Sequence, residues 1–344
     1  MSEYKKKFLL IRFSSIGDII QSTSVISTII RYYPNSSIDF VTLSRFSSIF
    51  KNHKHINTVY SISSKESVKN IYKIAKEIRN NEYSYIVDLH RSTRSSFFKI
   101  PFEKSKIKTI IKPRWNRFNL FLFHRNLFSK NFSVRSMFHD SISDILPKDY
   151  QIQRSKLYIS SNEEKDVEQF LKAKNKKIKD YFVIVPGSAW SQKEWLVSRY
   201  VKIINKFYKK EKITPVLIGS LSDKICNTIE KSSKIDLINL CGKTTLRQSF
   251  SLLSKALFTL GSDTGMIHAS EALNRPTISI LGPTSRETGA SLFNKNSHII
   301  KPSNLWCRPC SQNGSFPCYR KKQYCLSGVD ENVVLNAMSQ ISIL

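Results

Sequence analysis

The regular alternation of short apolar segments with longer amphipathic ones is the feature that most constrains the fold. In the first half of the chain, helices are predicted at 18–33 and 66–79, because Ile19 and Ile26 fall near helical spacing and Pro34 ends the first helix. The apolar segments predict strands at 7–12, 38–43, 56–60, 85–89 and 107–111. Strands that alternate with helices in this way indicate a parallel sheet with helices on both faces.

The same alternation begins again near residue 182. It predicts strands at 182–185, 215–218, 237–240, 257–260 and 277–281, and a terminal helix at 330–341. Because 344 residues exceed what one ordinary core holds, we expect two doubly wound α/β domains, 1–165 and 175–344. The connector carries a predicted strand at 156–159 and a charged helix at 163–173. Ligands of such sheets bind beyond the carboxyl ends of the strands, so the expected site is a cleft between the domains.

The charge of the chain predicts an anionic partner. A formal net charge of +29 attracts nucleic acid, acidic lipid, or a phosphorylated or carboxylated substrate, although heavy use of Lys, as in an AT-rich genome, also explains part of it. Between Arg91 and Lys130 there are eleven Lys and Arg residues against one acid, Glu103, with Phe and Trp interleaved. This mixture is typical of contact with a membrane surface or a lipid substrate, and the alternative is that many of these rings belong to the core.

Three features bear on where the protein works. No run reaches the roughly 18 apolar residues that a membrane span needs. The N-terminus passes from charged residues directly into a strand, without the apolar stretch of a signal peptide. With the basic, aromatic region, these features lead us to expect a cytoplasmic protein at the inner membrane surface.

In the first half, two polar segments follow predicted strands. The segment 14–18 joins a strand to a helix through Gly17, and it lacks the further glycines of a dinucleotide fingerprint or P-loop. Asp18 is either a catalytic carboxylate or a helix N-cap. Arg91 and Arg94 follow the strand at 85–89, where they either bind an anion or form a generic basic helix start.

In the second half, the polar turns suit a phosphorylated ligand. Ser188 and Lys193 follow the first strand, and a turn, a hydroxyl and an ammonium of this kind hold phosphate oxygens. The segment 261–268 places Asp263, Thr264, Gly265 and His268 at a predicted helix start. The first amides of a helix lack internal partners and lie at the positive end of its dipole, so they bind anions. An ordinary surface loop and a structural histidine are the alternatives.

Four of the six cysteines cluster near the C-terminus, at Cys307, Cys310, Cys318 and Cys325. A structural zinc ion, disulfides and free buried thiols are the three interpretations, and a reducing compartment disfavours disulfides. Cys226 and Cys241 are interpreted as small core residues.

Taken in this order, the segments 11–18, 33–34, 88–95, 186–195 and 261–284 resemble glycosyltransferase family 9, the ADP-heptose:lipopolysaccharide heptosyltransferases. The resemblance covers most of the chain. It implies a GT-B fold, with two Rossmann-like domains facing across a cleft, the acceptor on the first and the sugar nucleotide on the second. It also implies an inverting, metal-independent transfer of heptose from ADP-heptose to the inner core of lipopolysaccharide, with no required cofactor.

The resemblance implies roles for individual residues. Asp18 matches the proposed general base, and Arg91 and Arg94 fall where the family binds its anionic glycolipid acceptor. The donor-binding positions are Ser188, Lys193, Thr244, Asp263, Thr264, Gly265 and His268, with Thr244 in a turn near the adenine. Where some members carry a ribose-binding Glu, this chain has Leu221, with Asp223 nearby as a substitute.

Two other functions stay open at this point. A GT-B enzyme with another nucleotide sugar, such as a UDP-hexose, is the first alternative. A nucleic-acid-binding protein is the second, but no recognition helix, RNA-binding sheet motif or zinc-finger spacing supports it, so we expect no nucleic acid partner.

Overall fold

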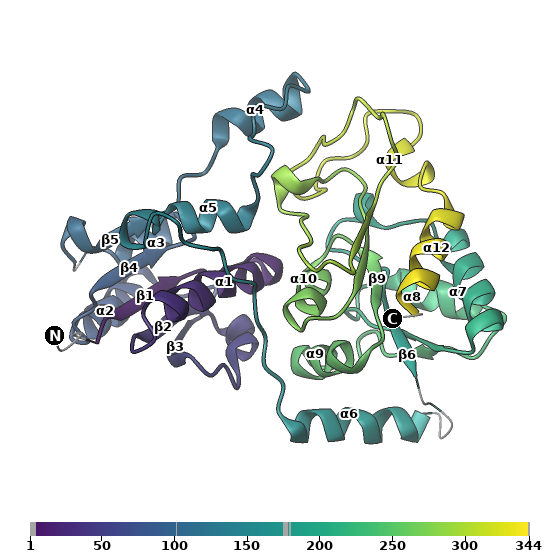
Figure 1. The fold of residues 1–344 in the computed structure, drawn as a ribbon, viewed down its shortest axis with the longest axis horizontal. Coiled ribbons are helices and arrows are strands. Elements are labelled where there is room, and N and C mark those ends of the chain that lie inside the picture. The colour runs from purple at the N-terminus through teal and green to yellow at the C-terminus, as the bar shows by residue number, and fades with distance from the viewer. Residues whose placement is uncertain (1–4, 101, 175–177, 179, 343–344) are drawn as a thin grey trace. The chain divides into compact units, whose positions relative to one another are not determined.

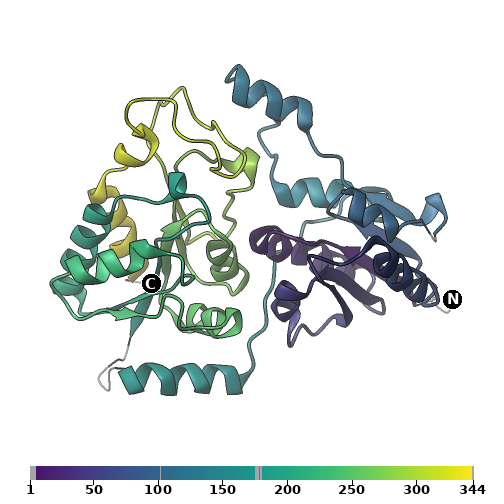
Figure 2. The ribbon, with the colours of Figure 1, turned by 180° about the vertical axis from the view of Figure 1, so that it is seen from behind.

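The computed structural model describes residues 5–100, 102–174, 178 and 180–342. These divide into two compact units (Figures 1 and 2). The first unit combines Met1–Lys112 with Val134–Tyr158, and the second combines Pro113–Ser133 with Ile159–Leu344. Residues 113–133 thus belong to the second unit, inside the range predicted for the first domain. The predicted start of the second domain, residue 175, lies outside the described residues.

The first unit contains a five-stranded parallel sheet in the order β3-β2-β1-β4-β5. Its strands are β1 (Lys7–Ile11), β2 (Ser37–Leu43), β3 (Ile56–Ile62), β4 (Tyr85–Asp88) and β5 (Ile107–Thr109). Its helices are α1 (Ile16–Tyr32), α2 (Val68–Arg79), α3 (Thr93–Phe97) and α5 (Val134–Asp140). The strand order reverses at β1, which makes the ends of β1 and β4 the switch point where such sheets bind ligands.

Burial explains why these residues form a central strand. Phe8, Leu9, Leu10 and Ile11 are fully buried, so β1 is covered on both faces, as parallel strands are. Helix α1 begins at a capping box, in which Ser15 and Asp18 each accept the backbone N–H of the other.

The second unit contains a six-stranded parallel sheet in the order β11-β10-β9-β6-β7-β8. Its strands are β6 (Tyr181–Val185), β7 (Thr214–Leu217), β8 (Ile238–Asn239), β9 (Thr259–Ser262), β10 (Thr277–Ile280) and β11 (His298–Ile300). Its helices are α4 (Arg114–Leu122), α6 (Ser161–Lys174), α7 (Val197–Glu211), α8 (Lys224–Ser232), α9 (Leu246–Lys255), α10 (Gly265–Ala272), α11 (Tyr324–Ser327) and α12 (Glu331–Ser342). A core of aromatic and branched side chains fills the space between α7, α12 and the sheet.

The predicted α/β class with two Rossmann-like sheets is confirmed. Three details were wrong. The segment 156–159 is not a strand, strand β11 was not predicted, and α4, α5 and the short α11 were missed. Helix α4 was missed because its exposed face is itself apolar, which obscures the periodicity that marks an ordinary surface helix.

The interpretation of Cys226 and Cys241 needs a correction. Cys226 is buried in the core as predicted, but it forms a disulfide with Cys241, which links α8 to the turn after β8. The expected reducing compartment had disfavoured any disulfide. Among the described residues, no helix combines the length and apolarity required to span a bilayer.

Candidate active site

Asp18 lies just beyond the carboxyl end of β1, in the first turn of α1. Nη2 of Arg12 is 2.6 Å from its Oδ2. The backbone N–H and hydroxyl of Ser15 donate to the same oxygen at 3.2 and 3.1 Å. The N-cap of α1 is Ser15, so Asp18 is not itself the cap but closes the capping box from the third helical position. About a third of its side chain stays accessible to a substrate (30%).

The surroundings of Asp18 keep it ionised. Burial by itself raises the pKa of Asp18, but the charge of Arg12 and the hydrogen bonds from Ser15 and Arg12 outweigh it, so the pKa lies below its ordinary value. At neutral pH the side chain is therefore a carboxylate that can accept a proton from a bound hydroxyl.

The loop after β4 carries Arg91 and Arg94, and buried Asp88 organises it. Asp88 accepts the backbone N–H groups of His90 and Arg91 at 3.0 and 2.8 Å. Arg91 donates through Nη1 to the carbonyl of residue 110 at 3.3 Å, and Arg94 donates through Nη2 to the carbonyl of Ser64 at 2.9 Å. Because β4 pairs with β1, Arg91 and Asp18 follow neighbouring strand ends.

His90 lies beside this site and was not predicted as a site residue. Its ring lies edge-on to Phe13, with 5.0 Å between ring centroids. Burial, and then the positive charges of Arg12 and Lys112, lower the pKa of His90 to about 4, so the imidazole is neutral at pH 7. Its buried Nδ1 has no hydrogen-bond partner in the described part of the chain. The only sequence signal was its position between Asp88 and Arg91.

In the second unit, the loops after β6, β9 and β10 bring Lys193, Asp263 and Thr284 together, and His268 of α10 lies beside them. Lys193 ends a 3₁₀ turn, Ser191–Lys193, and its Nζ donates to the carbonyl of Asp263 at 2.5 Å and lies 3.5 Å from Asp263 Oδ2. The hydroxyl of Thr284, after β10, donates to the same carboxylate at 2.9 Å. Nε2 of His268 is 3.9 Å from Asp263 Oδ1. We call these four residues the Asp263 cluster.

Helix α10 begins at the Asp263 cluster. Thr264 is its N-cap and Gly265 its first residue, so the unpaired amides of the first turn follow directly after Asp263. The hydroxyl of Thr264 is buried and has no partner among the described residues. Buried polar groups are normally hydrogen-bonded, so an orphaned hydroxyl at a helix start beside a lysine marks a place for a ligand oxygen.

The remaining predicted donor residues lie along the same sheet edge. Ser188 follows β6, and its hydroxyl accepts the N–H of Trp190 at 3.3 Å. Thr244 follows β8, two strands from β6, and its hydroxyl lies 2.9 Å from that of Ser249. Thr244 therefore shares the edge but follows a strand that is not adjacent to β6 or β9.

Asp223 occupies the middle of this edge. A Cβ on Gly187 would lie 2.5 Å from Asp223 Cγ, and one on Gly219 would lie 2.5 Å from its Oδ2, so a larger residue at either position would displace the Asp223 side chain. The N–H of Ser220 donates to the same carboxylate at 2.7 Å. Leu221, at the position expected for the ribose contact, is 88% exposed.

The Cys-rich loop supports the Asp263 cluster, and no sequence pattern predicts this contact. Arg308 donates to the carbonyls of Gly282 and Thr284 at 2.7 and 2.5 Å and so fixes the turn that carries the Thr284 hydroxyl. Gly314, with a φ of +84°, packs on the stem of Lys193, and a Cβ there would lie 2.6 Å from Lys193 Cγ. The loop thus positions both ends of the Lys193–Asp263 contact.

The zinc prediction is not supported. The four clustered cysteines are free thiols: Cys307, Cys310, Cys318 and Cys325. Among the described residues, no group of three or more His, Cys, Asp or Glu side chains lies close enough together to hold a metal ion. Burial raises the pKa of Cys325 to about 11, so it is a neutral thiol at pH 7.

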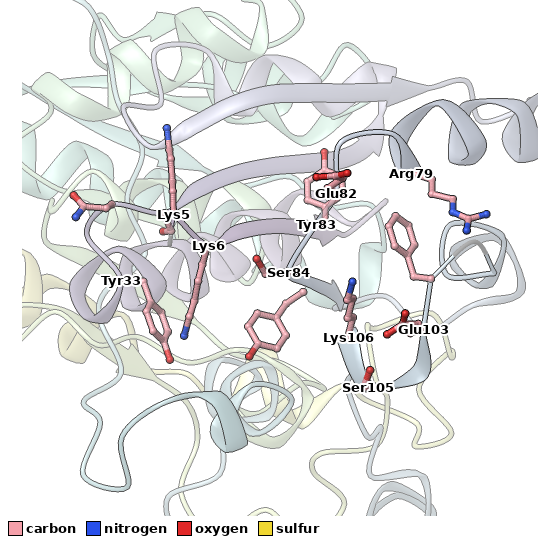
Figure 3. A pocket seen from close by; sticks show the side chains of 14 residues that line it. Lys5, Lys6, Tyr33, Arg79, Glu82, Tyr83, Ser84, Glu103, Ser105 and Lys106 are labelled. Atoms are coloured by element: carbon pink, nitrogen blue, oxygen red, sulfur yellow. The ribbon is translucent and has the colours of Figure 1, made fainter. Parts of the chain in front are cut away.

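A hollow of about 1050 Å³ in the first unit lies elsewhere (Figure 3). Lys6, Tyr33, Tyr85 and Lys106 line it, around the amino ends of β1, β4 and β5. Asp18 and Arg91 follow the opposite, carboxyl ends of these strands, and no predicted site residue lines the hollow. It is therefore separate from the candidate active site.

The chain is similar in sequence to known glycosyltransferases along most of its length. The family described as Glycosyltransferase family 9 (heptosyltransferase) matches residues 71–319. The chain is 23% identical to the lipopolysaccharide core heptosyltransferase OpsX of Haemophilus influenzae over 287 residues, 81% of this chain and 80% of that protein. It is 23% identical to lipopolysaccharide heptosyltransferase 1 of Campylobacter coli over 351 aligned residues, 97% of this chain and 98% of that protein.

Solved structures share the fold along nearly the whole chain. A family 9 glycosyl transferase from Veillonella parvula superposes with a TM-score of 0.79 at 14% identity and covers 98% of both chains. The ADP-heptose lps heptosyltransferase II of E. coli has a TM-score of 0.75 at 19% identity and covers 97% of this chain and 98% of that one.

Proposed function

The chain belongs to glycosyltransferase family 9, the heptosyltransferase family, and we propose that it moves a heptose from ADP-heptose to the inner core of lipopolysaccharide. The observation that supports binding of the donor diphosphate is the Thr264 hydroxyl at the start of α10, beside Lys193, which is buried without a hydrogen-bond partner among the described residues. The names of the relatives support the sugar and the acceptor, since they are lipopolysaccharide heptosyltransferases.

We assign the donor to the second unit. Lys193 Nζ, the Thr264 hydroxyl and the amides at Thr264 and Gly265 hold the diphosphate, and Asp263 accepts hydrogen bonds from heptose hydroxyls. Asp263 suits this role because Thr284 and Lys193 both contact its Oδ2. These contacts fix the carboxylate and leave Oδ1 to accept a hydrogen bond from the sugar. Ser188, Thr244 and His268 complete the donor site, with Thr244 toward the adenine. A solved E. coli heptosyltransferase contains ADP-2-deoxy-2-fluoro heptose, which is consistent with an ADP-sugar donor.

We assign the acceptor to the first unit. Arg91 and Arg94 bind the anionic groups of the glycolipid, and Asp18 receives the hydroxyl that attacks. Because the acceptor carries acyl chains, the protein works as a peripheral protein at the cytoplasmic surface of the inner membrane.

The chemistry is a single displacement with inversion. The acceptor oxygen forms a bond to the anomeric carbon, the bond from that carbon to the diphosphate oxygen breaks, and the proton passes to Asp18. The hydroxyl becomes acidic as its oxygen bonds to carbon, so a carboxylate of lowered pKa still takes the proton. The charge that develops on the leaving diphosphate is stabilised by Lys193 and the α10 amides, and the step needs no cofactor.

The test is a transfer assay with purified protein, ADP-heptose and inner-core acceptor. Asp18→Asn should lower kcat at least about a hundredfold, as loss of a general base does, and should leave ADP affinity unchanged. Retained turnover would remove Asp18 from the mechanism. Mass spectrometry of lipopolysaccharide from a strain lacking the protein should show the loss of one heptose and its position.

A GT-B transferase with a different nucleotide sugar is the second candidate, because Leu221 stands where some members carry a ribose-binding Glu, so this chain contacts the nucleoside differently from those members. An exposed apolar side chain at that position cannot accept a ribose hydroxyl. Thermal shifts with ADP, UDP and GDP distinguish the two. Stronger stabilisation by ADP supports the heptosyltransferase, and stronger stabilisation by UDP supports the alternative.

A further inference from the structure

Helix α4 presents an exposed apolar face. Trp115, Phe118 and Leu122 recur at i, i+3 and i+7, which places them on one side of the helix, and they are 68%, 47% and 60% exposed. Leu120, on the opposite side, is buried, and so is Asn119 at the border of the exposed face. No other helix or strand of the described chain makes more than marginal contact with α4. The apolar side is therefore uncovered, whereas a helix of a globular protein normally turns it inward.

The exposed surface continues past the helix. Phe123 and Leu127 are also more than half exposed, and the rings of Trp115 and Phe118 stack at 5.6 Å. Further along, the ring of His124 lies 5.2 Å from exposed Trp306. We call Trp115, Phe118, Leu122, Phe123 and Leu127 the α4 patch. A contiguous apolar patch of this kind marks an interaction site.

The charges carried by the segment that forms the α4 patch are of one sign. Residues 113–133 contain four cations, Arg114, Arg117, Arg125 and Lys130, and no acidic residue. Arg114, Arg125 and Lys130 are exposed. A surface that combines Trp, Phe and Leu with cations alone matches an anionic bilayer, in which rings enter the headgroup region and cations meet acidic lipid. A protein partner would need an apolar pocket surrounded by acidic residues, and nothing in this chain indicates such a partner.

We propose that α4 is the membrane-docking element of this protein and that it inserts its Trp115–Phe118–Leu122 face into the headgroup region of anionic phospholipid. This inference rests on the proposed function in one respect, because a lipid-linked acceptor gives docking its purpose. The bilayer itself, rather than the acceptor, is the ligand of the α4 patch.

The test is co-sedimentation of the full-length protein with vesicles of phosphatidylethanolamine and phosphatidylglycerol, which contain no lipopolysaccharide. The Trp115→Ser/Phe118→Ser/Leu122→Ser variant should partition about 100-fold more weakly than wild type, since three apolar side chains lose their insertion. The matched control, Val68→Ser/Tyr72→Ser/Val333→Ser, removes three apolar side chains that are about equally exposed, and it should bind as wild type does.

A second pair of variants tests the charge. Arg114→Gln/Arg125→Gln/Lys130→Gln should weaken binding about 100-fold at low salt, from about 1 kcal/mol per cation. Lys206→Gln/Lys209→Gln/Lys231→Gln removes the same charge elsewhere and should have a much smaller effect. Vesicles of phosphatidylcholine should bind wild type weakly. Unchanged binding by the α4 variants, or an equal loss in the controls, overturns the proposal.

Failure of this inference can be told from failure of the proposed function. The apolar α4 variant should retain wild-type transfer to a water-soluble acceptor without acyl chains, which also shows that it folds. If wild type binds vesicles through α4 but transfers no heptose to any acceptor, the proposed function is wrong and the docking element stands. If wild type transfers heptose but the α4 variants bind vesicles as wild type does, the docking element is wrong and the proposed function stands.

Discussion

Arg12 and Asp18 form an ion pair, with 2.6 Å between Nη2 and Oδ2, at the switch point of the first sheet. Arg12 comes directly after β1, and its Nη1 also donates to the carbonyl of Leu89 at 2.5 Å. The guanidinium is therefore held from one side by the backbone after β4 and presents its other edge to Asp18. We regard Arg12 as a positioning residue that fixes the carboxylate and its charge.

The first prediction concerns this pair. In Arg12→Gln the charge that lowers the pKa of Asp18 is lost and the effect of burial remains, so the pKa rises. The acid limb of the kcat profile, where the carboxylate becomes protonated, should therefore move to higher pH. Kinetics across the acidic range measure it.

Ser15→Ala is the control for Arg12→Gln. It removes one hydroxyl donor and leaves the backbone donor of Ser15, so it should shift the same limb in the same direction by less. An acid limb that does not move in Arg12→Gln would show that Asp18 is not the titrating base.

The second prediction concerns the orphaned hydroxyl at α10. Thr264→Val keeps the shape of the side chain and removes its oxygen, so it should weaken ADP binding about tenfold or more, the value of one hydrogen bond to a charged group. Thr264→Ser restores the hydroxyl and should restore affinity. Isothermal titration with ADP measures both. If Thr264→Val and wild type bind ADP with equal affinity, the Thr264 hydroxyl does not contact ADP and the prediction is wrong.

The third prediction concerns Lys193 and the loop that supports it. Lys193→Ala should lower kcat about 10² to 10³-fold, as the loss of one donor to a developing charge does. Gly314→Ala should lower it as well, because its new methyl group displaces the Lys193 stem and its φ of +84° disfavours alanine.

A double-mutant cycle separates these causes. If Gly314 acts through Lys193, Gly314→Ala should add little to Lys193→Ala. Additive losses would mean that the alanine damages the loop in some other way. Urea unfolding of each variant shows whether the loop change also lowers the stability of the unit.

The fourth prediction concerns stability. Arg247 on α9 donates to both carboxylate oxygens of Glu163 on α6 at 2.8 Å. These bonds, against the effect of burial, lower the pKa of Glu163 from 4.5 to about 2. Because the folded pKa is lowered, the stabilisation is fully present above pH 4.5 and disappears as pH falls toward 2. Glu163→Gln should therefore lower the free energy of unfolding at pH 7 by about 1 to 2 kcal/mol, less than the full pKa difference implies because solvent screens the pair.

Urea unfolding at several pH values measures this difference. The gap between wild type and Glu163→Gln should narrow as pH falls below 4.5. Lys202→Gln, which removes an exposed ion pair with Glu331, is the control and should cost less than about 1 kcal/mol at any pH. A gap that does not depend on pH would contradict the assignment.

The sequence by itself determined the fold class and the edge at which the polar residues gather. Alternating apolar and amphipathic segments report local burial, which is set by neighbours in the chain, so the strands and the loops that follow them were predictable. Asp18 in the first sheet, and Lys193 and Asp263 in the second, were predicted for the same reason, since parallel strands bring their carboxyl ends to one edge of their sheet.

Only the tertiary structure decided which side chains meet. Arg12 faces Asp18, Arg308 holds the turn of Thr284, and Gly314 packs on Lys193. Such partners depend on strand order and loop paths, and residues far apart in the chain leave no periodic signal of their contact. The disulfide between Cys226 and Cys241 and the uncovered face of α4 were beyond prediction for the same reason, because composition cannot tell which apolar surface finds a neighbour.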